Sequence, residues 1–205
     1  MNKRLIMLVA CAALAVAGSA FAQGDVNAGK QKAAVCAACH GPDGNSINPI
    51  WPSLAGLGER YIVRQLQLFK NGDRQDPLMS PQAQALSEQD MLDLAAYFAG
   101  LSMRPSGADP ELVELGERIW RGGIPERQVP ACAACHGPAG EGNPAAAYPR
   151  LGGQQAVYLA NSLTAYKTGQ RISGEQTGIM NDIARQLTED EIRAVSSFAS
   201  GLYHP

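Results

Sequence analysis

Two identical pentapeptides carry the side chains of this chain that are best suited to covalent and metal chemistry. Residues 36–40 read Cys-Ala-Ala-Cys-His, residues 132–136 read the same, and both are followed by Gly-Pro. Two thiols three positions apart can each add to one vinyl group along one edge of a porphyrin. The histidine that follows then lies under the iron, where it can coordinate the metal. This is the pattern of c-type haem attachment, and its exact repetition predicts two covalently bound haem c groups.

Other uses of these cysteines explain less of the sequence. A thioredoxin-like Cys-x-x-Cys needs a βαβ context, and no alternating strand pattern is present. A four-cysteine zinc site would need the two pairs to converge across more than ninety residues. Two disulfides are conceivable in an exported protein, but they leave both histidines and the repeat unexplained.

The first 22 residues have the features of a secretory signal peptide. A basic start at residues 2–4 is followed by an apolar run over residues 5–17 and by Ala20-Phe21-Ala22, a small-x-small cleavage site. Cleavage near Ala22/Gln23 predicts export to the periplasm, and Cys11 leaves with the signal. A lipoprotein box ending at Cys11 is the weaker interpretation, because the apolar run before it is very short. No later stretch reaches eighteen apolar residues, so we expect no membrane span. A loose association with the membrane surface stays open.

The charge balance of the mature chain indicates which kinds of partner it can bind. Two of the 17 basic residues leave with the signal, which leaves 15 against 19 acidic residues, a net charge of −4 before any haem carboxylates are counted. Nucleic-acid binding needs a basic face, so this balance argues against it. It suits instead a protein partner with a complementary positive patch.

The chain after the signal consists of two similar halves with helical apolar spacing. The spacing predicts helices over residues 59–70 and after the capping residues Ser87 and Thr188. Equivalent positions are 96 residues apart at the cysteines, 97 at a Pro-x-Leu segment and 101 at the last helix, which indicates duplication of one domain. We therefore predict an all-α fold: a first domain at residues 23–103, a linker at 104–110 and a second domain at 111–205. Such small cores are marginal alone, so each covalent haem would stabilise its domain.

Methionine is the expected sixth ligand of each iron, because it raises the reduction potential of a c-type haem. Met79 and Met180 occupy equivalent positions, each seven residues before the Leu that precedes a helix cap, in stretches of loop character. Met91 lies on a helical stripe and is expected in the core. Met103 is expected at the surface or in packing. His204 is expected in a solvated tail, with ligation in an alternative state or in a partner as the weak alternative.

Prolines, aromatic residues and basic residues near the two motifs also have predicted roles. Pro52 and Pro149 are expected either to shape their loops or, as the favoured alternative, to accept the ring N–H of His40 and His136 through their carbonyls. Two sets follow the same repeat. The aromatic residues Trp51, Tyr61, Tyr148 and Tyr158 are expected in the core or at a haem edge. The basic residues Lys70, Arg74, Lys167 and Arg171 are expected on solvated faces, with contact to haem carboxylates as the minority alternative.

With these residues in place, nearly all of the mature chain resembles di-haem cytochromes c of the cytochrome c4 type. The resemblance rests on both cysteine motifs, both Pro-x-Leu-x-Gly segments, the paired methionines and the capped terminal helices. It implies two tandem class I cytochrome c domains, each a few helices and long loops around one haem, with a pseudo-twofold relation. It also implies thioether links at Cys36, Cys39, Cys132 and Cys135, and the axial pairs His40/Met79 and His136/Met180.

The function that this resemblance implies is one-electron transport in the periplasm, from an electron donor complex of the respiratory chain to a terminal oxidase. The alternative is a permanent di-haem subunit of a larger dehydrogenase, such as a flavocytochrome c. A di-haem peroxidase is a distant third, because it needs an open position on one iron. No other catalytic constellation is present, so we expect no enzyme activity.

Overall fold

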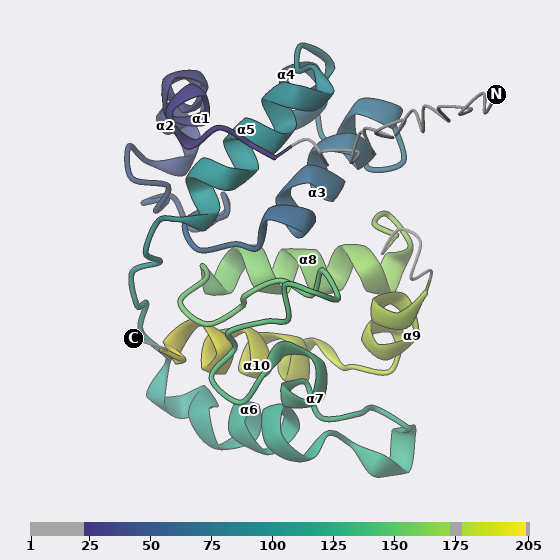
Figure 1. The fold of residues 1–205 in the computed structure, drawn as a ribbon. Coiled ribbons are helices and arrows are strands. Elements are labelled where there is room, and N and C mark those ends of the chain that lie inside the picture. The colour runs from purple at the N-terminus through teal and green to yellow at the C-terminus, as the bar shows by residue number, and fades with distance from the viewer. Residues whose placement is uncertain (1–22, 173–177, 204–205) are drawn as a thin grey trace, which may run out of the picture.

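The computed structural model describes residues 23–172 and 178–203. These residues fold into two sets of helices that follow each other along the chain, with long loops between them (Figure 1). The described residues contain no strand, only two isolated bridges, Ile124 with Val129 and Asn143 with Tyr148. The all-α prediction is therefore confirmed. No helix among the described residues is long and apolar enough to cross a membrane.

The helices of the two halves occur in matching order. The first half contains α1 (Val26–Lys32), η1 (Ala33–Val35), α2 (Ala37–His40), α3 (Glu59–Asn71), α4 (Met79–Gln84) and α5 (Glu88–Ala99). The second half contains α6 (Pro110–Gly122), η2 (Pro125–Arg127), α7 (Ala133–His136), α8 (Ala156–Thr168), α9 (Ile179–Arg185) and α10 (Glu189–Gly201). Figure 1 shows α8 lying between α3 of the first half and α10 of its own half.

Each half is built on a close crossing of its first and last long helices, α1 with α5 and α6 with α10. A glycine makes each crossing possible. A Cβ added at Gly29 would lie 2.0 Å from the carbonyl oxygen of Asp93, and one added at Gly116 would lie 2.4 Å from that of Ala194. Asp93 and Ala194 are equivalent in the repeat, so both halves bring their helix backbones together at the same point.

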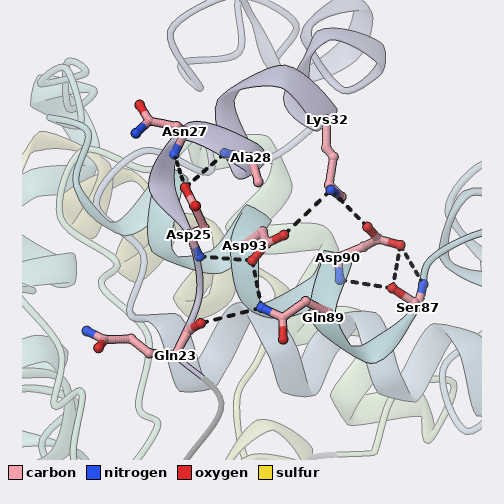
Figure 2. A network of polar contacts seen from close by, with 9 residues as sticks. All are labelled: Gln23, Asp25, Asn27, Ala28, Lys32, Ser87, Gln89, Asp90 and Asp93. Atoms are coloured by element: carbon pink, nitrogen blue, oxygen red, sulfur yellow. Dashed lines mark hydrogen bonds and ion pairs between the residues drawn. The ribbon is translucent and has the colours of Figure 1, made fainter.

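A polar network at the surface of the first half joins the start of α1 to α5 (Figure 2). The Asp25 side chain caps α1, and its own backbone N–H donates to Asp93 Oδ1 at 2.9 Å. Lys32 lies 3.1 Å from an oxygen of Asp90 and 3.5 Å from one of Asp93. Asp90 in turn completes a capping box with Ser87 at the start of α5. These contacts fix the helix that leads into the first cysteine motif.

The predicted capping residues are confirmed, since Ser87 and Thr188 both form capping boxes. The loop character predicted around the two methionines is wrong, because Met79 is the first residue of α4 and Met180 the second residue of α9. Pro81 is the third residue of α4, where its missing N–H has no intrahelical partner to lose. The proline is therefore compatible with the first turn of this helix.

The core of each half surrounds its crossing. In the first half it includes Leu94, Phe98 and Met103, and in the second Ile119, Trp120 and Phe198. Met91 is buried as expected. Met103 is also buried, so packing is confirmed and the surface alternative is excluded.

The two halves are joined by hydrogen bonds as well as by the connecting segment. The Gln154 side chain accepts from the Ser53 N–H and donates to the Ser53 carbonyl, both at 2.8 Å. Gln155 donates to the carbonyl of Ser46 at 2.6 Å. Where the connecting segment begins, the Arg104 N–H donates to Asn45 at 2.8 Å. The halves therefore meet through backbone groups of the loop that follows the first cysteine motif.

Candidate haem sites

Each Cys-Ala-Ala-Cys-His motif forms a single helical turn. Cys132 is the N-cap of α7, His136 is its last residue, and the His136 N–H donates to the Cys132 carbonyl at 3.0 Å. Cys36 and His40 hold the same places in α2, with the corresponding bond at 2.9 Å. A single helical turn therefore brings both thiols and the imidazole of each motif close together.

The two motif histidines are oriented by the prolines that the sequence singles out. His40 Nδ1 lies 2.7 Å from the Pro52 carbonyl oxygen, and His136 Nδ1 lies 3.0 Å from that of Pro149. Because a carbonyl only accepts, Nδ1 carries the hydrogen in each pair and Nε2 presents a lone pair. This confirms the predicted role of the two carbonyls and prepares each ring to bind a metal through Nε2.

Burial sets the protonation of the site. His40 and His136 are 5% and 7% exposed, and burial lowers the pKa of both imidazoles, although the hydrogen bond to proline partly opposes it. Both rings are therefore neutral, as metal ligation requires. Burial also raises the pKa of Cys36, and that of Cys132 to about 11. Before a haem is attached, the thiols of Cys36 and Cys132 thus stay protonated, a form that reacts slowly with oxidants and stray metal ions.

A cavity in the second half unites the predicted residues of that half. Cys132, Cys135, His136 and Met180 all line it. Its remaining walls are largely apolar and come from several elements: Trp120, Tyr148, Leu151, Leu159, Leu163 and Val195. A cavity lined by two thiols, a neutral imidazole and a thioether sulfur among apolar walls fits a covalently bound haem.

Met180 is positioned by a residue that the sequence did not single out. The next residue, Asn181, is 3% exposed and donates through Nδ2 to the carbonyls of Tyr166 and Arg171, both at 2.7 Å. These bonds attach the start of α9 to the end of α8 and to the segment beyond it. In the repeat, Asn181 is equivalent to Ser80, so a small polar residue follows the methionine in both halves. This equivalence was the one feature of the sequence that could have indicated its role.

The first half holds its methionine in the equivalent place by different contacts. The Asp76 carboxylate accepts from the N–H groups of Leu78 and Met79, both at 2.9 Å, and the Asp76 N–H donates to Ser80 Oγ. A side chain from the preceding loop thus caps α4. The elements that carry Cys36, Cys39, His40 and Met79 match those of the second half one for one.

The basic residues predicted on solvated faces are bound to protein groups, so that prediction is wrong. Lys70 donates to the Leu86 carbonyl, and Lys167 donates to the Leu187 carbonyl. Each lysine thus links the helix that carries it, α3 or α8, to the leucine that precedes the N-cap of the last helix of its half. Arg171 is buried between the halves, because α3 and α8 close over it.

The rival uses of the cysteines find no support in the part of the chain that is described. None of the four cysteines is paired in a disulfide there. No three His, Cys, Asp or Glu side chains of these residues converge as a metal site. His204 lies outside the described residues.

Comparison with known proteins gives consistent matches. The cytochrome c family model matches residues 26–102 and 115–202. Cytochrome c4 of Azotobacter vinelandii is 46% identical, over 99% of this chain and 100% of its own length. The crystal structure of reduced recombinant cytochrome c4 from Pseudomonas stutzeri superposes with a TM-score of 0.85 at 44% identity, covering 88% of this chain and all of that one. A thiosulfate dehydrogenase electron acceptor of Stutzerimonas stutzeri is 36% identical, over 87% of this chain and 82% of its own.

Proposed function

We propose a site assignment from the premise that this chain belongs to the cytochrome c family, as a member of the cytochrome c4 type with two covalently bound haem c groups. Cys36 and Cys39 attach the first haem, and Cys132 and Cys135 attach the second. The axial ligands are His40 with Met79 and His136 with Met180. The observation that carries this assignment is the cavity that Met180 shares with the second cysteine motif.

The same proposal includes the domain boundaries, with domains at residues 23–103 and 111–205 and a linker at 104–110. The family model supports them, because its two matches end at 102 and resume at 115. Helix α6 begins at Pro110, so the linker runs directly into the first helix of the second domain.

The protein is an electron carrier and not an enzyme. Haem c, when bound, supplies an iron that exchanges one electron between its ferric and ferrous states. The chain contributes neutral imidazoles, each held in one orientation by a proline carbonyl, and thioether ligands that raise the reduction potential. With His40, Met79, His136 and Met180 as its ligands, neither iron would have a free position for a substrate. The apolar walls contributed by Trp120, Leu159 and Val195 exclude water from the second site.

We infer that the carrier works in the periplasm and delivers electrons from a donor complex to a terminal oxidase. The support is the predicted signal at residues 1–22, which lies outside the described residues, and the cytochrome c4 relatives. The acidic balance of the mature chain favours docking on a positive patch of the partner. Contacts of this kind are small and transient.

A second candidate function is service to a dehydrogenase, as its electron acceptor or permanent subunit. One relative is named a thiosulfate dehydrogenase electron acceptor. Copurification of this chain with a dehydrogenase, at one-to-one ratio and through gel filtration, would favour the permanent subunit over the free carrier.

Absorption spectroscopy of the exported protein tests the ligand assignment. We expect two haems per chain, low-spin in both oxidation states, with the weak red band of methionine-bound ferric haem. Carbon monoxide should leave the reduced spectrum nearly unchanged. Replacing Met180 with Ala should remove half of the red band and let one haem bind carbon monoxide.

The matched control is Met91→Leu, which replaces a buried methionine of α5 that faces the core. It should keep the full red band and stay closed to carbon monoxide. A Met180→Ala protein with an unchanged red band would refute the assignment.

A further inference from the structure

Both backbone groups of Ser53, in the loop after the first cysteine motif, are held by one side chain of the second half. Gln154 Oε1 accepts from the Ser53 N–H, and Gln154 Nε2 donates to the Ser53 carbonyl, both at 2.8 Å. Because an N–H only donates and a carbonyl only accepts, one orientation of the side-chain amide satisfies both groups. The same Oε1 accepts from the Gln155 N–H at 3.0 Å, so both of its lone pairs are used.

The peptide unit that Gln154 binds is the one that orients the first motif histidine. The N–H of Ser53 and the carbonyl of Pro52 belong to the same planar peptide unit. That carbonyl accepts from His40 Nδ1 at 2.7 Å. A continuous chain of hydrogen bonds therefore runs from the Gln154 amide, through one peptide unit, to the imidazole assigned to the first iron. His40, Ser53 and Gln154 are all buried, so the low local dielectric strengthens each bond.

Hydrogen bonds in such a chain polarise one another. An acceptor at the N–H of a peptide unit shifts electron density towards its carbonyl oxygen, which then accepts more strongly, by about 10–30% per bond. A stronger acceptor at Nδ1–H makes the imidazole a more basic ligand through Nε2. A more basic ligand stabilises the ferric state of the iron and so lowers its reduction potential.

The repeat places a different kind of residue at the equivalent position of the first half. The residue 97 positions before Gln154 is Leu57, which is buried in the core of the first half. Its side chain has no polar atom, so it cannot bind the peptide unit after Pro149 in the same way. The histidine contacts differ in the direction that this asymmetry predicts. The Nδ1-to-carbonyl distance is 2.7 Å at His40 and 3.0 Å at His136.

We propose that Gln154 is a positioning residue for the first haem: through the peptide unit between Pro52 and Ser53, it strengthens the hydrogen bond to His40 and lowers the reduction potential of that haem. The proposal rests on the ligation of the first iron by His40 set out above. It makes the potential of the first haem depend on a residue of the second half, and therefore on how the halves dock. It also separates the potentials of two haems that have the same types of axial ligand.

Spectroelectrochemistry of the purified di-haem protein, followed by its absorption bands, tests the proposal. Gln154→Leu removes the acceptor from the Ser53 N–H and introduces the residue type found at position 57. It should raise one of the two midpoint potentials, so that the ratio of reduced to oxidised haem at fixed potential rises about threefold, or ~28 mV for one electron. A merely structural role gives the opposite sign, because water that enters a loosened site stabilises the more highly charged ferric iron.

The matched control is Gln155→Leu, the same change at the next residue, whose Nε2 also crosses to the first half and donates to the Ser46 carbonyl at 2.6 Å. It removes a contact between the halves but leaves the peptide unit that faces His40 intact, so both potentials should stay nearly unchanged. Gln154→Glu is the conservative variant, because a carboxyl oxygen still accepts from the Ser53 N–H. It should keep the potential of the first haem at or below the wild-type value.

Proton NMR of the reduced protein assigns the effect to one haem. Gln154→Leu should move the Nδ1 proton of His40 to higher field and leave that of His136 in place, because a weaker hydrogen bond deshields its proton less. Should Gln154→Leu fail to fold, the wild-type spectrum carries the test. The His40 proton should then lie at lower field than the His136 proton, and equal or reversed positions refute the proposal.

The potentials overturn the proposal in three ways. Gln154→Leu leaves both unchanged or lowers one, Gln155→Leu raises one as far as Gln154→Leu does, or Gln154→Glu does so. Failure of the ligand assignment gives a different signature. A wild-type protein with fewer than two haems, or without the red band of methionine ligation, refutes that assignment. Two haems with intact bands, and potentials that Gln154→Leu does not raise, refute only the role of Gln154.

Discussion

Replacing Gly116 with Ala should open the helix crossing that supports the second haem site. A Cβ at this position would lie 2.4 Å from the Ala194 carbonyl oxygen and 2.6 Å from the Phe198 Cβ. Unstrained contacts between carbon atoms need about 3.5–4.0 Å, so α6 must move away from α10 by about 1 Å. Both obstacles are backbone or Cβ atoms, which no rotamer change can remove.

The expected cost follows from two opposing effects. Ala is preferred over Gly inside a helix by about 1 kcal/mol. Forcing an extra carbon into a packed interface costs about 1–3 kcal/mol, and more where the backbone itself must shift. We expect the cost of separating the helices to exceed the gain in helix propensity, so that the free energy of unfolding falls by about 2 kcal/mol. For a domain of this size that corresponds to a decrease in Tm of about 8–16 °C.

The assay is thermal and urea unfolding of the haem-loaded protein, followed by far-UV circular dichroism and by the haem absorption of each oxidation state. Gly122→Ala is the matched control in the same helix, since a Cβ there meets nothing within 4 Å. We expect it to be neutral or stabilising by about 0.5–1 kcal/mol. If Gly116→Ala proves as stable as Gly122→Ala, the helices do not approach as closely as described and the reasoning fails.

Three further predictions concern other contacts. Hydrogen bonds from Ser87 and Lys32 lower the pKa of Asp90 to about 2. The stabilisation from this carboxylate is therefore complete above its unfolded pKa of about 3.9 and is lost as the pH falls toward 2. Asp90→Asn should cost about 1 kcal/mol at pH 7 in urea unfolding, and a difference from wild type that persists undiminished at pH 2 would contradict this. Gln154→Ala leaves backbone groups of Ser53 without partners at the contact between the halves, which costs about 1–3 kcal/mol. It should speed proteolysis within the proposed linker at residues 104–110, whereas Gln67→Ala, at an exposed position, should not. Equal cleavage rates in the two variants would argue against the contact. Trp120→Phe removes the bond from Nε1 to the Pro138 carbonyl and part of a fully buried ring. It should lower the unfolding free energy by about 1–2 kcal/mol. Trp51→Phe, at a half-buried site, is the control, and an equal loss there would refute a specific role for the Trp120 hydrogen bond and ring.

Features that depend on neighbouring residues were predicted well from sequence. The number of haems follows from the two cysteine motifs, because the thiols and the imidazole of each motif need only one helical turn to converge. The caps at Ser87 and Thr188 are equally local, since a capping box spans four residues. The proline carbonyls beside His40 and His136 were found because the repeat kept them at nearly constant spacing from each histidine.

Features that depend on how elements pack were predicted poorly or not at all. The helix that begins at Met79 depends on a cap supplied by the Asp76 side chain. The prolines on either side of Met79 are compatible with both a turn and a short helix, so they did not reveal which of the two forms. The shared roles of Lys70 and Lys167 depend on carbonyls that are 16 and 20 residues away along the chain. Asn181 was missed because its acceptors become neighbours only when α9 packs on α8.

The clearest contrast is between His136 and Arg171. The role of His136 is dictated by its position after two cysteines, whatever the rest of the chain does. Arg171 has the sequence context of an ordinary surface arginine, one turn beyond a helix that ends in glycine. Its burial, and its contact with Tyr61 more than a hundred residues away, arise only because the two halves dock with α3 against α8, which removes water from a charge that the local sequence leaves exposed.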